Sequence, residues 1–263
     1  MNGKVNGMST DDMKKSPVDE IEDIDVGDDK KQPHKGVYLL PNLFTTAALF
    51  SGFYSIIAAM NENYANAAVA IFISMLFDAL DGRVARLTHT QSAFGAEYDS
   101  LADMVSFGIA PALVVFTWSL APLGKVGWIA AFIYAVGAAL RLARFNTMLG
   151  VEEKRYFTGL PSPAAAAIVA GIIWAANDKG VSGETLATMM ALIVPLTGLL
   201  MVSNVKYRSF KDLNLKGRVP FVVLLIAVLV LVLIALEPAL SLMCVFCLYG
   251  LWGPLGIVFK RLR

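Results

Sequence analysis

Two short segments in the first half of the chain combine acidic, glycine and arginine residues. One reads DALDGRVAR from Asp78 to Arg86, and eight residues later another reads GAEYDSLAD from Gly95 to Asp103. Both lie in or beside runs that are apolar enough to cross a membrane, where an uncompensated carboxylate costs roughly 3 kcal/mol or more. The four aspartates of these segments therefore need a compensating charge, and a divalent metal ion is the simplest one: Asp78, Asp81, Asp99 and Asp103.

Helical spacing places these carboxylates on two faces. At about 100° per residue, positions 78, 81, 82 and 85 share one face of a helix, and positions 95, 99 and 103 share a face of the next. A loop of only several residues joins the two helices, so we expect antiparallel neighbours whose acidic faces converge. Hard oxygen ligands favour Mg²⁺, Mn²⁺ or Ca²⁺ over zinc. Two such ions about 4 Å apart are used by many phosphoryl-transfer enzymes.

A simpler interpretation is that the aspartates pair with Arg83 or Arg86 as anchors at the helix ends. That interpretation would suffice for one aspartate. Four aspartates on two matched faces, separated by Gly and Ala, favour a metal site. Arg86 lies one step off the first face, and its planar guanidinium matches the geometry of a phosphate.

The composition predicts an all-α integral membrane protein. The chain is 57% hydrophobic and 16% charged, with a mean hydropathy of +0.62. A membrane-spanning helix needs roughly 20 mostly apolar residues, and about eight runs are candidates. They cover residues 38–60, 65–87, 97–120, 124–147, 162–178, 184–203, 219–236 and 239–259. The second and third runs are the least apolar, and they carry the aspartates.

The chain divides into four regions by composition. Residues 1–35 are polar and lack a hydrophobic stretch, which predicts a disordered tail and no signal peptide. Residues 36–203 form the predicted catalytic core of six membrane helices, and residues 219–263 add two helices and a basic C-terminus. The basic loop between them, residues 204–218, is expected to contact anionic lipid headgroups rather than nucleic acid.

Lysine and arginine are distributed unevenly between the two sides of the predicted bundle. They gather after the second, fourth and sixth helices and at the C-terminus, whereas the opposite loops hold little beyond Lys125 and Lys179. The positive-inside rule then places the acidic faces at the cytoplasmic side of the cell (inner) membrane. Cys244 and Cys247 are read as apolar thiols within the last helix.

The pattern DxxDGxxAR, eight residues, GxxxDxxxD resembles the signature of the CDP-alcohol phosphatidyltransferase family. Every fixed position is matched, and the resemblance covers at least residues 38–200. It implies a reaction in which an alcohol attacks the lipid-side phosphorus of a CDP-linked lipid and CMP leaves. It also implies that the four aspartates hold two divalent ions (Mg²⁺ or Mn²⁺), with Asp103 as general base, and that the protein is a homodimer.

The same resemblance implies a set of residues that bind the CDP-lipid. Gly82 and Ala85 match positions that accommodate the nucleotide, and Arg86 fits a role near phosphate. Asn42 and Thr45 face the nucleotide or cap the first helix, and the two alternatives stay open. The expected CDP-lipid site comprises Asn42, Thr45, Gly82, Ala85, Arg86 and Gly95.

Within the family, the chain looks most like the members that transfer a phosphatidyl group from CDP-diacylglycerol to L-serine. The supporting stretches are PNLFT at 41–45, ADMVSFG at 102–108, RLARFN at 141–146 and FTGLPSP at 157–163. Serine carries a carboxylate, so Arg141, Arg144 and Asn146 are candidate serine ligands, although both arginines suit membrane anchoring equally well. Other acceptors (glycerol 3-phosphate or inositol phosphate) and a cation-coupled transporter remain alternatives. The aspartate pattern occurs once, without the internal repeat common in transporters.

Overall fold

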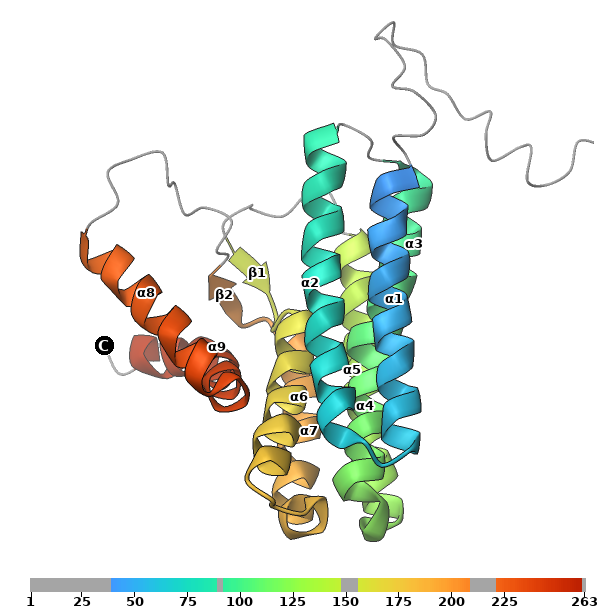
Figure 1. Ribbon diagram of the computed structural model, residues 1–263, viewed down its shortest axis with the longest axis vertical. Helices are drawn as coiled ribbons and strands as arrows, with labels where there is room; N and C mark the ends of the chain where they lie inside the picture. The colour runs from blue at the N-terminus through green and yellow to red at the C-terminus, as the bar shows by residue number, and fades with distance from the viewer. Residues whose placement is uncertain (1–38, 89–91, 148–155, 209–220, 262–263) are drawn as a thin grey trace, which may run out of the picture. The chain divides into compact units, whose positions relative to one another are not determined.

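The computed structural model describes residues 39–88, 92–147, 156–208 and 221–261, and the described parts of all eight predicted runs are largely helical. The tail at 1–35 and most of the basic loop at 204–218 lie outside the described residues. The helices between residues 39 and 202 stand side by side as a bundle, whereas the two C-terminal helices are inclined to it, and a short two-stranded ribbon lies near one end of the bundle (Figure 1). The main helices are α1 (Leu39–Met60), α2 (Tyr64–Thr88), α3 (Ala93–Asp103), α4 (Ala110–Val115), α5 (Lys125–Thr147), α6 (Ser162–Asp178), α7 (Ala187–Val202), α8 (Phe221–Leu236) and α9 (Pro238–Arg261).

The predicted third membrane helix is one continuous helical segment, Ala93–Leu123, with a changing hydrogen-bond pattern. It begins as α3, widens into π-helix over Met104–Ile109, and continues through α4, a second π segment at Phe116–Leu120 and a 3₁₀ turn at Ala121–Leu123. The first π segment directly follows Asp103. Such segments are frequent at functional sites because they change the direction in which neighbouring side chains project.

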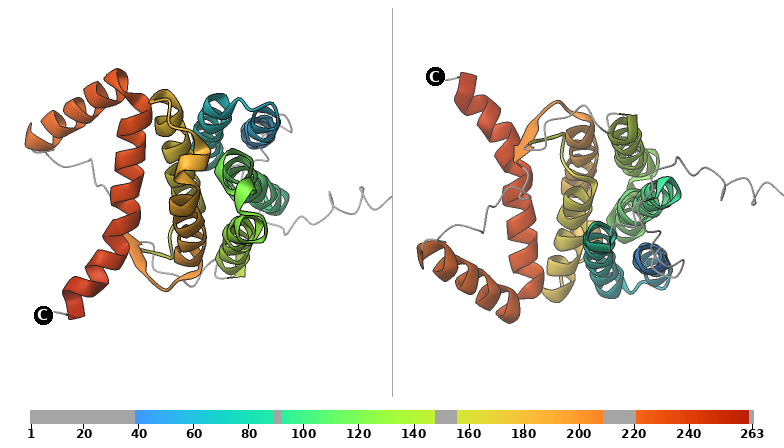
Figure 2. Two further views of the ribbon diagram at one scale, coloured as in Figure 1. Left: turned by 90° about the horizontal axis from the view of Figure 1, so that it is seen from below. Right: turned by 90° about the horizontal axis from the view of Figure 1, so that it is seen from above.

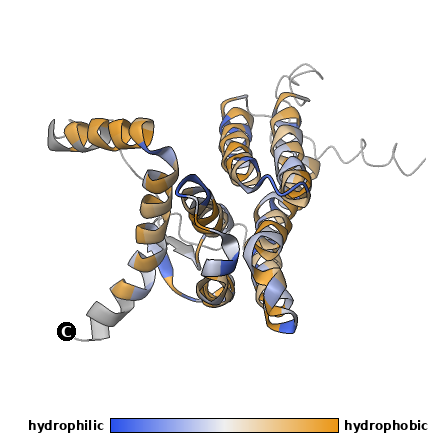
Figure 3. Cartoon of the chain, turned by 60° about the horizontal axis from the view of Figure 1, so that its bottom comes forward, coloured by the Kyte–Doolittle hydropathy of each residue, from blue (hydrophilic) through white to orange (hydrophobic). Residues whose placement is uncertain are grey.

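Five helices within the described ranges are long and apolar enough to cross a membrane: Leu40–Met60, Ala93–Leu123, Lys125–Thr147, Gly183–Val202 and Pro238–Gly256. The other three expected spans are helical but lack that combination of length and hydropathy. Charged residues interrupt the last turns of α2, and α6 and α8 have 17 and 16 residues. Apolar residues run along the helices, and polar residues gather at their turns (Figure 3). The fold is thus that of an all-α membrane protein.

Serine hydroxyls and alanines hold α1 against α2. Ser51 Oγ donates to the carbonyl of Ala70 at 2.7 Å, and Ser74 Oγ donates to the carbonyl of Ala48 at 2.8 Å. Small residues let membrane helices approach closely, and hydroxyl donors reach the backbone of the neighbour. This contact fixes α2, and with it Asp78 and Asp81, relative to the start of α1.

A two-stranded antiparallel ribbon, absent from the sequence-based prediction, connects two loops. Strand β1 (Tyr156–Thr158) pairs with β2 (Lys206–Arg208), with Phe157 opposite Tyr207. The strands have only three residues each, which is too short for an alternating pattern to reveal them. The ribbon ties the segment before α6 to the segment after α7.

Candidate active site

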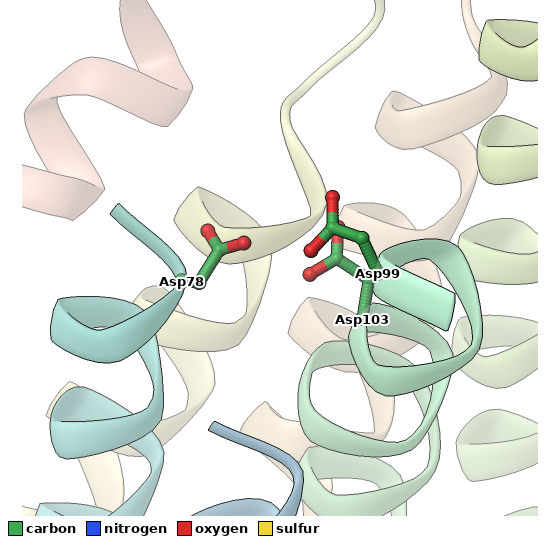
Figure 4. Close-up of side chains that lie close together, drawn as sticks. All are labelled: Asp78, Asp99 and Asp103. Carbon is green, nitrogen blue, oxygen red and sulfur yellow. The ribbon is translucent and has the colours of Figure 1, made fainter. Parts of the chain in front are cut away.

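Three of the four aspartates form a compact group between two helices. Asp78 extends from α2 toward Asp99 and Asp103 of α3 (Figure 4), and one carboxylate oxygen of each lies within 4.8 Å of those of the other two. Oxygens bound to a single Mg²⁺ or Ca²⁺ at about 2.0–2.6 Å lie at most about 5 Å apart. The group is therefore the right size to hold a divalent ion.

Asp81 lies next to this group and is held by α1. It is buried, and Thr45 Oγ1 donates to its Oδ2 at 2.8 Å. Its carboxylate is within hydrogen-bonding reach of Asp99, and Asp103 is within the same reach of Asp78. Carboxylates this close repel one another when ionised, and a bound cation would relieve the repulsion. The structure thus brings all four aspartates together, three in the compact group and Asp81 beside Asp99.

A pocket of about 360 Å³ opens beside Asp81 and Asp99. It contains every residue that the sequence predicted for the CDP-lipid, together with three that it did not predict (Pro41, Ser92 and Ala96). Its lining comprises Pro41, Asn42, Thr45, Asp81, Gly82, Ala85, Arg86, Ser92, Gly95, Ala96 and Asp99. Ser92 caps α3 by accepting a hydrogen bond from the Gly95 amide at 3.0 Å. A serine just before a helical run is a common helix cap, so the sequence alone could have identified Ser92 as the cap of this helix.

Two glycines shape this pocket in different ways. A Cβ at Gly82 would meet no atom within 4 Å, so the α2 backbone is open to the pocket there. A Cβ at Gly95 would lie 3.1 Å from Ser92 Oγ and 3.5 Å from Asn42 Oδ1. Gly95 therefore lets the start of α3 approach α1, whereas Gly82 leaves space for a ligand.

Arg86 is fixed on the wall of the same pocket. Its Nε donates to the carbonyl oxygen of Gly82 at 2.7 Å, one helical turn earlier. This bond holds the base of the guanidinium close to the helix, and the side chain remains exposed. The arginine is thus placed beside Gly82, where a phosphate could meet a fixed positive charge.

Arg141 of α5 lies near the acidic group and is not part of the pocket lining. Its Nη1 donates to the buried Ser162 Oγ at 2.6 Å, and its charge interacts electrostatically with Asp103. Ser162 begins α6 and belongs to the GLPSP stretch. Because this hydrogen bond orients the guanidinium, a fixed cation stands next to the acidic group.

The other two candidate serine ligands have different surroundings. Arg144 donates from Nη2 to Asn204 Oδ1 at 2.9 Å, beyond the end of α7. Asn146 donates from Nδ2 to Ser100 Oγ at 3.0 Å. The structure therefore brings Arg141 into electrostatic contact with Asp103, while Arg144 and Asn146 connect α5 to neighbouring segments.

The chain belongs to the CDP-alcohol phosphatidyltransferase family. The model of that family matches residues 38–202, which include α1 to α7 and all four aspartates. Membership in a transferase family sets aside the transporter alternative.

Similar known proteins carry a more specific name. A protein of Helicobacter pylori (strain ATCC 700392 / 26695), named CDP-diacylglycerol–serine O-phosphatidyltransferase, is 38% identical over 87% of this chain and 96% of its own length. A protein of the same name from Mycobacterium leprae is 31% identical over 85% of this chain and 76% of its own. Another, from Methanocaldococcus jannaschii, is 39% identical over 54% of this chain and 63% of its own.

Proposed function

We propose that this protein transfers the phosphatidyl group of CDP-diacylglycerol to the hydroxyl of L-serine, giving phosphatidylserine and CMP. The observation that carries the proposal is the acidic group of Asp78, Asp99 and Asp103, which adjoins the pocket formed by α1, α2 and α3. The similar proteins named for this reaction support serine as the acceptor. Glycerol 3-phosphate and inositol phosphate carry a phosphate, for which a denser basic pocket would be expected.

The pocket would hold the CDP part of the lipid. The open backbone at Gly82 and the small side chain of Ala85 leave room for a flat nucleotide, and Arg86 offers a fixed cation to a phosphate. The pyrophosphate would then reach the aspartates, since Asp99 belongs both to the pocket lining and to the acidic group, and Asp81 lies beside it.

Two divalent ions (Mg²⁺ or Mn²⁺) held by the four aspartates would neutralise the pyrophosphate and the charge that develops on CMP. Asp103 is the residue proposed to accept the proton of the serine hydroxyl. The serine oxygen then forms a bond to the phosphorus that carries diacylglycerol, and the bond from that phosphorus to the CMP oxygen breaks. Arg141, beside Asp103, is the best placed of the predicted ligands to bind the serine carboxylate.

In this proposal the protein acts in the cell (inner) membrane, with the site on the cytoplasmic side, as a homodimer. CDP-diacylglycerol would arrive within the membrane and serine from the cytosol. Arginines at the site end of α2 and α5 support this orientation, as the positive-inside rule expects.

The test measures CMP release by the purified protein from CDP-diacylglycerol with Mg²⁺ or Mn²⁺ and single alcohols. We expect release with serine, loss of release on chelation, and recovery when the metal is returned. Asp99→Asn should lower the rate by about a hundredfold or more, because it removes a charged metal ligand. Asp178→Asn, at an exposed position at the end of α6, is the matched control and should leave the rate unchanged. Undiminished release by Asp99→Asn would refute the metal site, and release only with another alcohol would refute serine as the acceptor.

A further inference from the structure

Two hydrogen bonds fix how α5 packs against the membrane segment that carries Asp99 and Asp103. The Tyr134 hydroxyl donates to the carbonyl oxygen of Phe107 at 3.0 Å, and Asn146 Nδ2 donates to Ser100 Oγ at 3.0 Å. The partners follow each other in opposite order along the chain, so the two segments are antiparallel. The acidic end of α3 therefore lies level with the last turns of α5.

Arg141 and Asp103 lie between these two bonds, on faces that meet. Arg141 is two helical turns after Tyr134 and shares its face of α5. Asp103 is about one turn before Phe107, on the side of its segment that packs on α5. The register of the two segments thus places the guanidinium at the level of the acidic group, in agreement with its electrostatic interaction with Asp103.

Ser162, the first residue of α6, holds this guanidinium. Its Oγ accepts a hydrogen bond from Arg141 Nη1 at 2.6 Å, and the serine is fully buried. Hydrogen bonds with a charged donor are shorter and stronger than neutral ones. Because the guanidinium is a planar fork, a bond to one of its nitrogens also restricts the direction in which the others point.

The turn before α6 gives Ser162 a fixed position. The Leu160 amide donates to the carbonyl oxygen of Leu200 at 3.0 Å, near the end of α7. Gly159 has a φ of 84°, and a Cβ there would collide with the carbonyl oxygen of Met201. Only glycine suits that backbone conformation and that close approach. The turn is thus attached directly to the end of α7.

Helix α7 is in turn fixed to α5, which carries Arg141. The two helices run side by side (Figure 2). A Cβ at Gly198 would lie 2.8 Å from the Cα of Tyr134, and a Cβ at Gly137 would collide with the Gly198 carbonyl oxygen. Small residues allow such backbone contact between membrane helices. The turn, α7 and α5 therefore form a closed frame that holds Ser162 against Arg141.

We propose that Ser162 is a positioning residue that orients the guanidinium of Arg141 toward the carboxylate of the acceptor. The inference rests on the proposed function, in which Arg141 binds that carboxylate, and deepens it by assigning a residue that sets the affinity for serine. A guanidinium binds a carboxylate best through two parallel N–H bonds, which requires a defined orientation of its plane. Without the Ser162 hydroxyl the charge remains, but its orientation is no longer fixed.

The experiment compares Ser162→Ala with the unaltered protein in the CMP-release assay. The KM for serine should rise about tenfold, as expected when a hydrogen bond to a charged group is lost, and it should change more than kcat. The KM for CDP-diacylglycerol should stay the same. Because a KM does not depend on the amount of folded protein, partial misfolding would not imitate this result. Ser162→Cys is similar in size and offers a weaker acceptor, so its KM for serine should be intermediate.

Ser119→Ala is the matched control. Ser119 is also fully buried and donates to the carbonyl of Gly183 at 2.7 Å, about four helical turns beyond Asp103. Its replacement should leave the KM for serine unchanged. In an Arg141→Lys background, Ser162→Ala should raise that KM by less than about twofold, because lysine cannot make the paired contact that Ser162 orients.

The outcomes separate the inference from the proposed function. If the unaltered protein uses serine and Ser162→Ala keeps its KM, or raises it equally with Arg141 and with lysine at that position, the inference is wrong and the proposed function stands. If the unaltered protein releases no CMP with serine, the proposed function fails and the inference fails with it.

Discussion

At the scale of single residues, the site combines carboxylates at fixed helical spacing with positions that lack a side chain. Asp78, Asp99 and Asp103 converge within 4.8 Å, and Asp81 is tied to Thr45. The types and spacing of these residues predicted that the carboxylates would share helical faces, because spacing along a helix is a local property. The sequence could not predict that Arg141 lies near Asp103 while Arg144 binds Asn204. The two arginines are three residues apart, and they differ only in what packs around them.

Gly82→Ala tests whether the opening at Gly82 serves a ligand. The new methyl group meets no protein atom within 4 Å, and alanine favours a helix over glycine by up to about 1 kcal/mol, so the melting temperature should stay level or rise. If the nucleotide lies against this backbone, the KM for CDP-diacylglycerol should rise by about tenfold, as expected for overpacking that costs about 1–3 kcal/mol. Gly256→Ala, in equally open space on α9, is the control for both measurements. An unchanged KM in Gly82→Ala would place the nucleotide elsewhere.

At the scale of elements, the junction between α3 and the π segment that follows it positions Asp103. Ser106, in that segment, donates to the carbonyl of Ala48 at 3.1 Å. A Cβ at Gly52 of α1 would lie 2.7 Å from the Cα of Ser106. This close approach of α1 to the π segment depends on packing between distant parts of the chain, and the sequence pattern predicted only a continuous apolar helix there.

Gly52→Ala should therefore push the π segment away from α1 and displace Asp103. Overpacking costs about 1–3 kcal/mol, which should lower the melting temperature by roughly 3–10 °C. CMP release should fall further than the loss of folded protein explains, because Asp103 moves relative to Asp78. Thermal unfolding in detergent and the rate per folded molecule are the measurements. A variant that is stable and fully active would show that α1 does not constrain the aspartate.

At the scale of the whole molecule, charge distinguishes the two ends of the bundle. Arg86 and Arg144 lie in the last turns of α2 and α5, at the site end, whereas the turn between α1 and α2 contains Glu62. Long apolar helices between these ends predict a membrane protein with a fixed orientation.

Thiol labelling in right-side-out membrane vesicles tests that orientation. In a background with Cys244 and Cys247 replaced by serine, Glu62→Cys should react with a membrane-impermeant maleimide from outside. Thr147→Cys, at the opposite end, should react only after the membrane is permeabilised. Both variants should keep CMP release, which confirms that they are folded. The reverse labelling pattern would show that the site faces away from the cytoplasm.

The sequence by itself determined that the protein is an all-helical membrane protein, that four aspartates lie on two helical faces, and which family it resembles. It could do so because hydropathy runs and helical spacing are properties of neighbouring residues. Only the tertiary structure decided which carboxylates group together, that Thr45 binds Asp81, and that Arg141 rather than Arg144 stands beside Asp103. The tertiary structure also decided the β1–β2 ribbon. These contacts join residues that are far apart in the chain, and helix packing sets them rather than any local pattern.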